Sequence, residues 1–300
     1  RMNGPRDVPQ PIPYQGSKRQ LAPKIMRYFP PDFGRFVEPF AGSAAMSIAV
    51  ASRELCTEFW INDGHKPLIV LWREILKNPD PLANAYERLW NEQLGQEREF
   101  FNQVRDQFNQ SHEPHTFLYL LARCVKAAIR YNANGEFNNT PDNRRKGARP
   151  AEMRRRISRT AALLTKKTRT TSWDYSKVLS ECKSSDLVYM DPPYQGVCGK
   201  RDSRYLPTVE HEQFCNELDR LNRRDIRYLV SYDGRTGEKT YGQPMPESLY
   251  LTLVELPAGR STQATLLGRS DMTFESLYLS PALASEVSLE SNVESQLLPW

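Results

Sequence analysis

Hydrophobic and polar residues repeat with two different periods along this chain, and the two periods predict strands that alternate with helices. Short apolar runs rich in aromatic and β-branched residues predict buried strands, whereas apolar residues three or four positions apart predict amphipathic helices. The predicted strands are 36–40, 59–62, 168–173, 186–190, 226–231, 249–256 and 274–279. The predicted helices are 44–52, 67–77, 152–164, a short one near 176–179, and 211–221, with further helical periodicity from 81 to 129.

The order of these elements predicts an α/β fold. Strand, helix and strand follow one another between residues 36 and 77, which is the spacing of βαβ units and favours a parallel sheet. The last two predicted strands can pair as an antiparallel hairpin around a long loop. We expect one discontinuous α/β domain (1–80 and 168–285), a helical insertion (81–167) and a disordered tail (286–300).

Composition excludes several classes of protein. Hydrophobic residues make up 39% of the 300 positions, and no apolar stretch approaches the ~20 residues that span a bilayer. The first dozen residues contain no apolar signal-peptide core, so we expect a cytoplasmic protein that has no membrane partner. The five cysteines form no CxxC pair and the four histidines have no metal-ligand spacing, which favours reduced cysteines and no bound metal.

Positive charge is concentrated in one segment. Residues 144–169 contain eleven Lys or Arg and one acid, Glu152, which is a local charge of +10. Because the whole chain carries +5, the rest of it stands at −5. An otherwise acidic protein with one strongly basic segment is expected to use that segment on a polyanion such as nucleic acid. A nuclear-localisation-like run is the alternative, but the basic residues are spread over 26 positions.

The tetrapeptide Asp191-Pro192-Pro193-Tyr194 ends the predicted strand 186–190. A carboxylate and a proline carbonyl can accept hydrogen bonds from an exocyclic NH₂ group, and a tyrosine ring can stack on the heterocycle that carries it. The alternative is a strand that leaves the core through a proline turn, with the aspartate as a local cap. Other parts of the chain are needed to decide between the two.

A second motif, Phe36 to Ser43, predicts a strand that enters a glycine turn before a helix. Such a turn lets the backbone approach a ligand. The next strand ends about twenty residues further on at Asp63, where an acidic residue commonly binds the two hydroxyls of a ribose. The motif is not GxGxxG, which disfavours a nicotinamide cofactor. A nucleoside cofactor without a pyrophosphate fits better, and S-adenosylmethionine is the obvious candidate.

Two further segments agree with that interpretation. Tyr14 and Lys18 flank a flexible glycine, so that the lysine could neutralise a cofactor carboxylate and the tyrosine could cover its sulfonium or base. The alternative is a helix entry capped by Ser17. Asp174, after the strand 168–173, could accept a hydrogen bond from the cofactor adenine, or cap the short helix that follows. The two roles of Asp174 are compatible.

These motifs occur in one order that resembles the Dam-type, D12 class of DNA adenine-N6 methyltransferases. The matched segments are Tyr14–Lys18, Phe36–Ser43, Asp63, Arg130–Asn138 and Asp191–Tyr194. The resemblance covers residues 12 to 280. It implies a Rossmann-like S-adenosylmethionine-dependent methyltransferase sheet with an inserted helical target-recognition domain, and an enzyme that methylates N6 of a flipped adenine in double-stranded DNA.

The resemblance also assigns roles to individual positions. The cofactor-binding positions are Tyr14, Lys18, Glu38, Phe40, Gly42, Asp63, Asp174, Tyr175 and Asp191. The catalytic positions are Asp191, Pro192 and Tyr194. The DNA-binding positions, from the matched stretch and the basic segment, are Arg130, Tyr131, Asn132, Asn134, Asn138, Arg144, Arg145, Lys146, Arg154 and Arg155. No metal is implied, and a cognate restriction endonuclease in a bacterial, archaeal or phage-infected cell is a possible separate partner.

The chain departs from relatives that methylate GATC. Ala133 and Asn134 stand where those relatives have leucine and arginine, and arginine is the usual bidentate partner of guanine. The loop 141–150 also differs from their aromatic-rich hairpin, which argues against GATC as the target. The alternatives in function are methylation of adenine in RNA, methylation of cytosine N4 in DNA, and a catalytically silent DNA-binding module.

Overall fold

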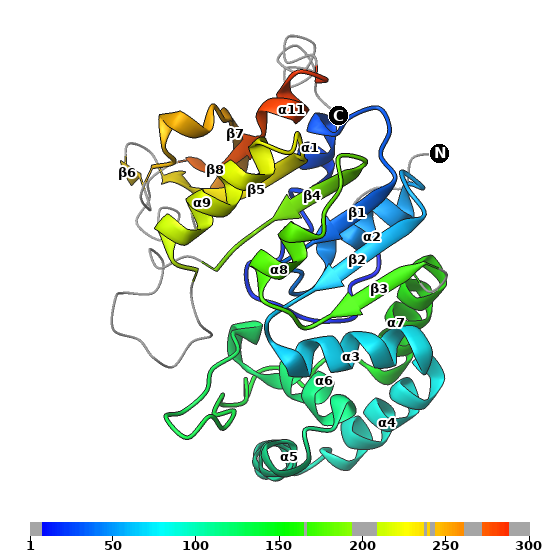
Figure 1. Cartoon of the computed structure of the whole chain (residues 1–300). Coiled ribbons are helices and arrows are strands. Elements are labelled where there is room, and N and C mark those ends of the chain that lie inside the picture. The colour runs from blue at the N-terminus through cyan, green and yellow to red at the C-terminus, as the bar shows by residue number, and fades with distance from the viewer. Residues whose placement is uncertain are drawn as a thin grey trace.

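A single twisted sheet forms the centre of the molecule (Figure 1). The computed structural model describes residues 8–164, 167–193, 209–236, 239–240, 244–260 and 272–287. Its strands are β1 (Arg35–Glu38), β2 (Glu58–Asn62), β3 (Thr168–Thr171), β4 (Asp186–Met190), β5 (Arg227–Thr236), β6 (Lys239–Thr240), β7 (Thr252–Arg260) and β8 (Met272–Leu279). They lie in the order β3-β2-β1-β4-β5-β8-β7, with β6 paired to β5.

Strand directions confirm the predicted topology. The strands β3, β2, β1, β4 and β5 run parallel to one another, whereas β8 is antiparallel to both β5 and β7. The predicted terminal hairpin is therefore present as β7 and β8. β5 extends five residues beyond the predicted end at Ser231. The continuation is polar in sequence, but pairing of Tyr232 and Arg235 with β8 supplies the backbone hydrogen bonds that periodicity does not reveal.

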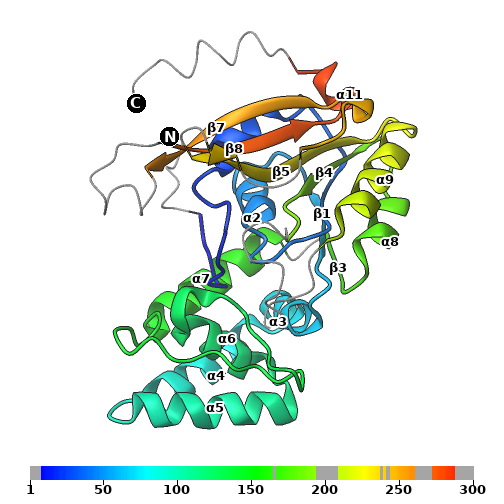
Figure 2. The same ribbon diagram turned by 90° about the vertical axis from the view of Figure 1, so that its left-hand side faces the viewer.

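Helices cover both faces of the sheet. They are α1 (Ala22–Ile25), α2 (Ala45–Ser52), α3 (Lys66–Lys77), α4 (Pro79–Glu92), α5 (Glu97–Ser111), α6 (Pro114–Arg123), α7 (Pro150–Leu164), α8 (Tyr175–Ser180), α9 (His211–Asn222) and α11 (Pro281–Ala284). Short 3₁₀ turns occupy Met26–Tyr28, Val125–Ala127 and Glu247–Leu249. Figure 2 shows α8 and α9 on one side of the sheet and α2 on the other.

Alternation along the central strands divides the core into two layers. In β4, Leu187 and Tyr189 join the larger apolar cluster with α1 and α2, while Val188 and Met190 join the cluster beneath α8 and α9. Successive side chains of a strand point to opposite faces, so a strand covered on both faces is mostly apolar, and the one charged residue of β4, Asp186, is paired with Arg35. All five residues of β4 are buried. This explains why its run of consecutive apolar residues marks a central strand.

The helices α3 to α7 pack together below the sheet (Figures 1 and 2). α4 packs on α6 and α7, α5 packs on α6, and α3 contacts both α6 and α7. α7 also contacts α2, which connects the helical group to the larger layer of the core. None of the helices within the described ranges has the length and apolar composition of a membrane span.

The chain after β8 differs from the sequence-based expectation. The sequence predicts no helix after the strand 274–279, yet Pro281–Ala284 form one helical turn. Ser280 caps it by accepting a hydrogen bond from Leu283 N, and the Leu283 side chain is fully buried. One capped turn is too short to be detected as a period. Residues 288–300, most of the predicted tail, lie outside the described ranges.

Candidate active site

A cavity of about 970 Å³ opens at the carboxyl ends of β1 and β4. These two neighbouring strands lead to opposite sides of the sheet, and such a switch point is where open α/β sheets bind ligands. The cavity is lined by every predicted cofactor position, namely Tyr14, Lys18, Glu38, Phe40, Gly42, Asp63, Asp174, Tyr175 and Asp191. Pro192 also lines it. Tyr194, the remaining predicted catalytic residue, lies outside the described residues.

Lys18 bridges two carboxylates at the end of β4. Its Nζ lies 3.2 Å from Asp191 Oδ2 and 2.9 Å from Glu275 Oε1. Burial opposes the charge of the lysine, but the two carboxylates outweigh it and raise the pKa of Lys18 above its usual value. Sequence reasoning predicted Lys18 and Asp191 but missed Glu275. No local motif marks that residue, because it sits in the middle of the antiparallel strand β8.

Glu38 is a buried acid at the end of β1. It is 3% exposed, and its Oε2 accepts hydrogen bonds from both the backbone N (2.9 Å) and the hydroxyl of Ser47. Burial raises the pKa of Glu38 to about 8, although the bonds from Ser47 oppose that shift. The carboxyl group therefore carries a proton at neutral pH and ties the start of α2 to β1.

Asp63 is oriented by two backbone amides. Its Oδ2 accepts from Gly42 N at 3.0 Å and its Oδ1 from His65 N at 2.9 Å. A carboxylate has about four acceptor positions, so each oxygen keeps capacity for another donor. Asp63 lines the cavity, and its remaining capacity suits a pair of hydroxyl groups such as those of a ribose.

Gly42 brings the glycine turn against Tyr14. The glycine has φ +51°, and a Cβ added there would lie 2.9 Å from Cε1 of Tyr14. Any side chain at this position would displace the tyrosine ring. The residue therefore has to be glycine for two reasons, backbone conformation and contact. The Gly42 carbonyl in turn accepts from Trp72 Nε1 of α3 at 3.0 Å.

Asn62 joins three of the loops that line the cavity, and sequence reasoning missed it. Its Nδ2 donates to the carbonyls of Pro39 (2.9 Å) and Trp173 (3.1 Å). Its Oδ1 accepts from Thr171 Oγ1 (2.7 Å) and Trp173 N (2.9 Å). A fully buried, fully bonded amide of this kind fixes geometry. Its one sequence signal is a polar residue at the end of an otherwise apolar strand.

Aromatic side chains form the wall of the cavity beneath α8. Phe40 and Tyr175 lie 5.1 Å apart between ring centroids. The Tyr175 hydroxyl is buried and has no hydrogen-bond partner among the described residues. Next to it, Asp174 caps α8 by accepting from Ser176 N at 3.0 Å, which confirms the capping role considered from the sequence. Asp174 also lines the cavity, so the second role stays available.

The Arg130–Asn138 stretch forms a tight turn beside the cavity. Asn132 closes it, since its Oδ1 accepts from the backbone N of Asn134 and of Glu136, both at 2.9 Å. Tyr131 bonds to His65 Nε2 and thereby connects this turn to the loop after Asp63. Asn134 lies exposed at the tip of the turn, whereas Asn138 is half-buried and Arg130 exposed. Burial lowers the pKa of His65 to about 4, so its ring is neutral.

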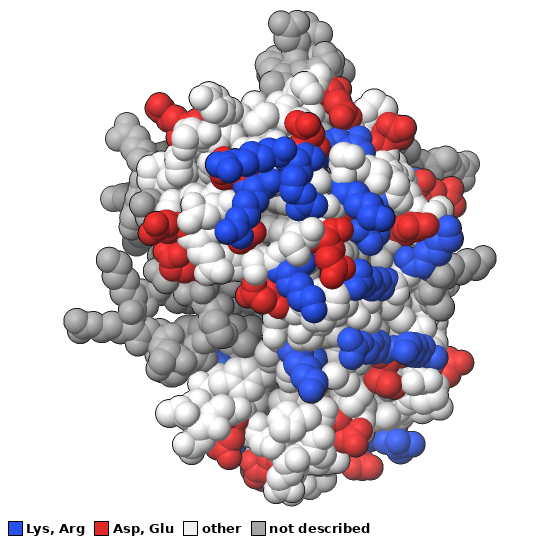
Figure 3. All heavy atoms as spheres, in the orientation of Figure 1, with Lys and Arg blue, Asp and Glu red and all other residues white. Residues whose placement is uncertain are grey.

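The predicted basic DNA contacts do not form one surface. Arg144 and Arg145 are exposed, while Lys146 pairs with Glu97 at 2.9 Å. Arg154 pairs with Glu87 of α4 at 3.2 Å, and Arg155 with Glu152 at 2.6 Å. None of these five lines the cavity that contains Asp191. Basic and acidic side chains are likewise interspersed on the face that carries α8 and α9 (Figure 3).

The loop that carries Arg144 and Arg145 is anchored by a buried cation. Arg123 is 1% exposed, and its guanidinium donates to Gln93 Oε1, to the Asp142 carbonyl at 3.0 Å and to the Arg145 carbonyl. These bonds satisfy the buried charge with oxygen acceptors. Arg123 thus positions the exposed basic loop, a role that its place in an apolar helix does not suggest.

The side chains that line the cavity fit a methyl donor that carries a nucleoside. Asp63 offers further acceptor positions, the Tyr175 hydroxyl has no partner in the part of the chain that the structure describes, and the wall at Phe40 is aromatic. These features match hydroxyls, polar edge atoms and a flat ring, respectively. Within the described ranges, no group of three or more His, Cys, Asp or Glu side chains is arranged to hold a metal ion.

Comparison with known proteins agrees with this geometry. The profile of the D12 class N6 adenine-specific DNA methyltransferase family matches residues 14–255, which is most of the chain. The matched range runs from Tyr14 on the N-terminal loop to β7 and includes the insertion.

Individual relatives are distant in sequence. The type II methyltransferase M1.LlaDCHI of Lactococcus lactis subsp. cremoris is 26% identical over 271 residues, 87% of this chain and 91% of its own. The modification methylase StsI of Streptococcus sanguinis is 24% identical over 77% of this chain and 37% of its own. The DNA adenine methylase of Salmonella typhi is 27% identical over 61% and 64%, respectively.

Proposed function

The chain belongs to the D12 class of N6 adenine-specific DNA methyltransferases, and we propose that methyl transfer takes place in the cavity at the carboxyl ends of β1 and β4. The observation that carries this proposal is the position of Asp191. It follows the central strand β4, lines the cavity, and is ion-paired there with Lys18 at 3.2 Å. One cavity thus contains a fixed carboxylate together with the residues suited to a nucleoside.

The proposed methyl donor is S-adenosylmethionine, which supplies an activated methyl group on a sulfonium when bound. The chain then has to bind and orient its two substrates, without a nucleophilic side chain. We assign the ribose hydroxyls to Asp63 and the adenine edge to Asp174 and Tyr175. Lys18 is already engaged by two protein carboxylates, so we assign it to positioning Asp191 and not to binding a cofactor carboxylate.

The acceptor amine is assigned to Asp191 and Pro192. The Asp191 carboxylate and the Pro192 carbonyl accept hydrogen bonds from the two N6–H groups of adenine. These bonds draw the nitrogen lone pair away from the ring and direct it into the cavity. Lys18 restrains the carboxylate in the orientation that this requires. Tyr194 is the proposed stacking partner of the base, and such stacking contributes ~1–3 kcal/mol.

The target adenine has to leave the duplex to reach Asp191, at a cost of a few kcal/mol. We propose that the helical insertion, residues 81–167, binds the duplex and that Tyr131 fills the space left by the base. Asn132 is less suited to this role because its side chain is committed to its own turn. Tyr131 makes one side-chain hydrogen bond, to His65, that would have to break. The exposed Arg130, Arg144 and Arg145 are the proposed phosphate contacts.

We further propose that the protein acts in the cytoplasm of a bacterium, an archaeon or a phage-infected cell, where its DNA substrate is found. A separate restriction endonuclease of the same specificity is a proposed partner. The name of the Lactococcus relative, a type II methyltransferase, supports this association.

The function is tested by incubating the protein with duplex DNA and S-adenosylmethionine and then identifying the modified nucleoside by mass spectrometry. N6-methyladenine is expected. Asp191→Ala is expected to abolish it while duplex binding persists, and Asp219→Ala, at an exposed acid on α9, serves as the matched control. Formation of N4-methylcytosine, or full activity of Asp191→Ala, would overturn the proposal.

A further inference from the structure

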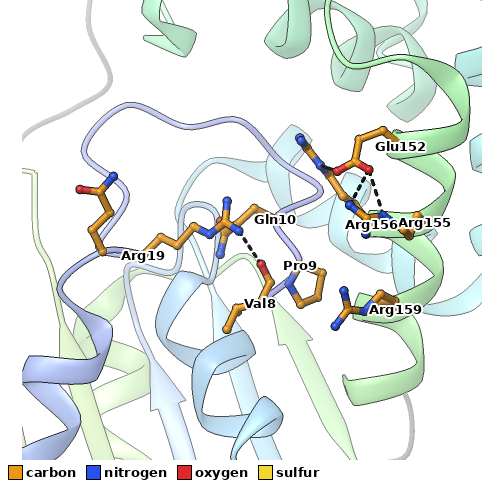
Figure 4. A pocket seen from close by; sticks show the side chains of 9 residues that line it. Val8, Pro9, Gln10, Arg19, Glu152, Arg155, Arg156 and Arg159 are labelled. Carbon is orange, nitrogen blue, oxygen red and sulfur yellow. Dashed lines mark hydrogen bonds and ion pairs between the residues drawn. The ribbon is translucent and has the colours of Figure 1, made fainter. Parts of the chain in front are cut away.

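A second cavity, of about 520 Å³, lies between the N-terminal segment and α7 (Figure 4). Its lining residues are Val8, Pro9, Gln10, Arg19, Gln20, Glu152, Arg155, Arg156 and Arg159. It shares no lining residue with the cavity that contains Asp191. Its volume falls in the range of small-ligand sites, roughly 300–1,000 Å³.

Positive charge dominates this second cavity. Among the described residues, four guanidinium groups line it and one carboxylate does. The carboxylate, Glu152, already pairs with Arg155 at 2.6 Å and with Arg156 at 2.7 Å. In Figure 4 the side chains of Arg156 and Arg159 extend from α7 toward the N-terminal segment. Burial lowers the pKa of Arg19, and the nearby charge of Arg156 lowers it further, whereas Glu152 opposes the shift.

A buried amide provides an independent indication of a ligand. Gln10 is 8% exposed, and its Nε2 has no hydrogen-bond partner among the described residues. A buried donor without an acceptor destabilises the folded protein, and an oxyanion in the cavity would offset that cost. The guanidiniums and the Gln10 Nε2 group are all hydrogen-bond donors, which suits an anion and not a cation.

The N-terminal segment connects the two cavities. Residues 8–10 and 19–20 line the second cavity, while 14–18 line the first. Arg19 joins the two ends of this segment, because its Nη2 donates to the Val8 carbonyl at 2.8 Å. A ligand that draws α7 and this segment together therefore acts one residue away from Lys18.

We propose that the second cavity binds a phosphate group, carried either by the DNA backbone or by a free nucleotide. Arginine forks match phosphate oxygens in geometry and charge, and the Gln10 amide supplies one more donor. The assignment rests on the lining of this cavity and not on methyl transfer, so it can fail while the proposed function stands. Only the version in which the phosphate belongs to the DNA backbone rests on the proposed function.

The first experiment measures binding of inorganic phosphate to the full chain by calorimetry, with sodium chloride at matched ionic strength as reference. Wild-type protein is expected to bind phosphate but not chloride. Arg159→Gln and Arg156→Gln are each expected to raise the dissociation constant roughly tenfold, the loss of one charge-assisted hydrogen bond. Arg223→Gln removes an equivalent charge from α9, where it pairs with Asp219, and is expected to leave the constant unchanged.

A second variant keeps the test valid if an arginine substitution unfolds the protein. Gln10→Glu has nearly the same shape, but it places a carboxylate where the unpartnered donor stands. The new charge is expected to pair with the arginines, raise the midpoint of thermal unfolding, and abolish the effect of phosphate. A destabilised Gln10→Glu protein that still binds phosphate would overturn the proposal.

The source of the phosphate is read from duplex binding as a function of salt. If the DNA backbone occupies the cavity, Arg156→Gln with Arg159→Gln lowers the salt slope of the binding constant by about 0.9 per lost phosphate contact. If a free nucleotide occupies it, the slope is unchanged and adenosine monophosphate binds with the same pattern across the variants. The proposal is wrong if neither inorganic phosphate nor the salt slope responds to these substitutions.

Discussion

The ammonium group of Lys18 lies 3.2 Å from the carboxylate of Asp191, although Lys18 precedes the first strand and Asp191 follows the fourth. Glu275, on β8, approaches the same ammonium group at 2.9 Å. The side chain of Asp191 is 30% exposed, so the ion pair sits at the cavity surface and not in the core. The Asp191 carboxylate is therefore oriented by a lysine that is itself paired with a second acid.

The first prediction concerns this three-residue arrangement. Lys18→Met is expected to lower kcat about ten- to a hundredfold, because Asp191 loses a charge-assisted hydrogen bond. Glu275→Gln is expected to lower kcat about tenfold at most, since its amide oxygen still accepts from Lys18. The KM for DNA should stay unchanged in both variants. Glu212→Gln, an exposed acid on α9, is the control, and an equal rise in KM would contradict a positioning role.

The second prediction concerns stability and pH. Burial raises the pKa of Glu38 from 4.5 to about 8, so between these values the folded protein binds a proton that the unfolded chain has released. Stability due to Glu38 is therefore fully present below pH 4.5 and falls as pH rises toward 8.

Glu38→Gln should remove this dependence while keeping an acceptor for Ser47. Between pH 5 and 8, the free energy of unfolding measured with urea is expected to change less with pH in the variant than in the wild type. The two slopes should differ by up to about 1.4 kcal/mol per pH unit. Glu58→Gln, at an exposed position of β2, should retain the wild-type slope. Identical slopes for wild type and Glu38→Gln would show that Glu38 is ionised in the folded state.

The third prediction separates contact from backbone strain at Gly42. Gly42→Ala forces a Cβ to within 2.9 Å of the Tyr14 ring, whereas Gly95→Ala meets nothing within 4 Å at a similarly positive φ. Each substitution carries about 1–2 kcal/mol of strain. Gly42→Ala alone is expected to weaken binding of S-adenosylmethionine, by at least tenfold in calorimetry. Equal affinities in the two variants would mean that Tyr14 does not contact the donor.

The fourth prediction tests the buried amide of Asn62. Asn62→Asp replaces its two N–H donors by an oxygen that faces the carbonyls of Pro39 and Trp173. We expect a loss of about 2–4 kcal/mol in the free energy of unfolding, from two broken hydrogen bonds and a buried charge. Asn91→Asp, at an exposed position on α4, should lose less than about 0.5 kcal/mol. Comparable losses would show that Asn62 does not join the loops in solution.

The fifth prediction concerns the basic segment. Charge reversal of Arg144 and Arg145, which are exposed, is expected to weaken duplex binding and reduce its salt slope without changing the midpoint of thermal unfolding. Arg154→Glu should instead lower that midpoint, because Arg154 bonds to Asn84 and Glu87 of α4. A salt slope that responds to Arg154→Glu alone would place α7, and not the exposed loop, at the DNA backbone.

Most elements of the fold could be predicted from local patterns, because the apolar residues in the sequence of each strand indicate that it is buried. β4 is buried at all five positions and apolar at the last four, since both faces of the sheet are covered, and the centres of β2 and β1 are likewise apolar and buried. The polar continuation of β5 could not be predicted this way, because its pairing with β8 depends on strand order. Capped single turns such as α11 are likewise too short to show a period.

That the proposed cofactor positions line one cavity was predictable for a related reason. Tyr14, Gly42, Asp63 and Asp191 lie at or near strand ends or turns, and the carboxyl ends of parallel strands meet at one edge of a sheet. Glu275 could not be predicted, because it lies within a strand that enters the sheet antiparallel and far along the chain. Asn62 could not be predicted for the same reason, since its four hydrogen bonds reach residues more than twenty positions away in the chain.

By itself, the sequence determined the order and approximate bounds of most strands and helices, and which motifs we propose for methyl transfer, because burial periodicity and reactive groups are local properties. Tertiary structure alone decided that Lys18 forms ion pairs with Asp191 and Glu275, and that Arg154 packs against α4. It also decided that Arg155, Arg156 and Arg159 surround a second cavity with Gln10. Each of these depends on which distant segments the sheet order and helix packing bring together, and charges act through space and not along the chain.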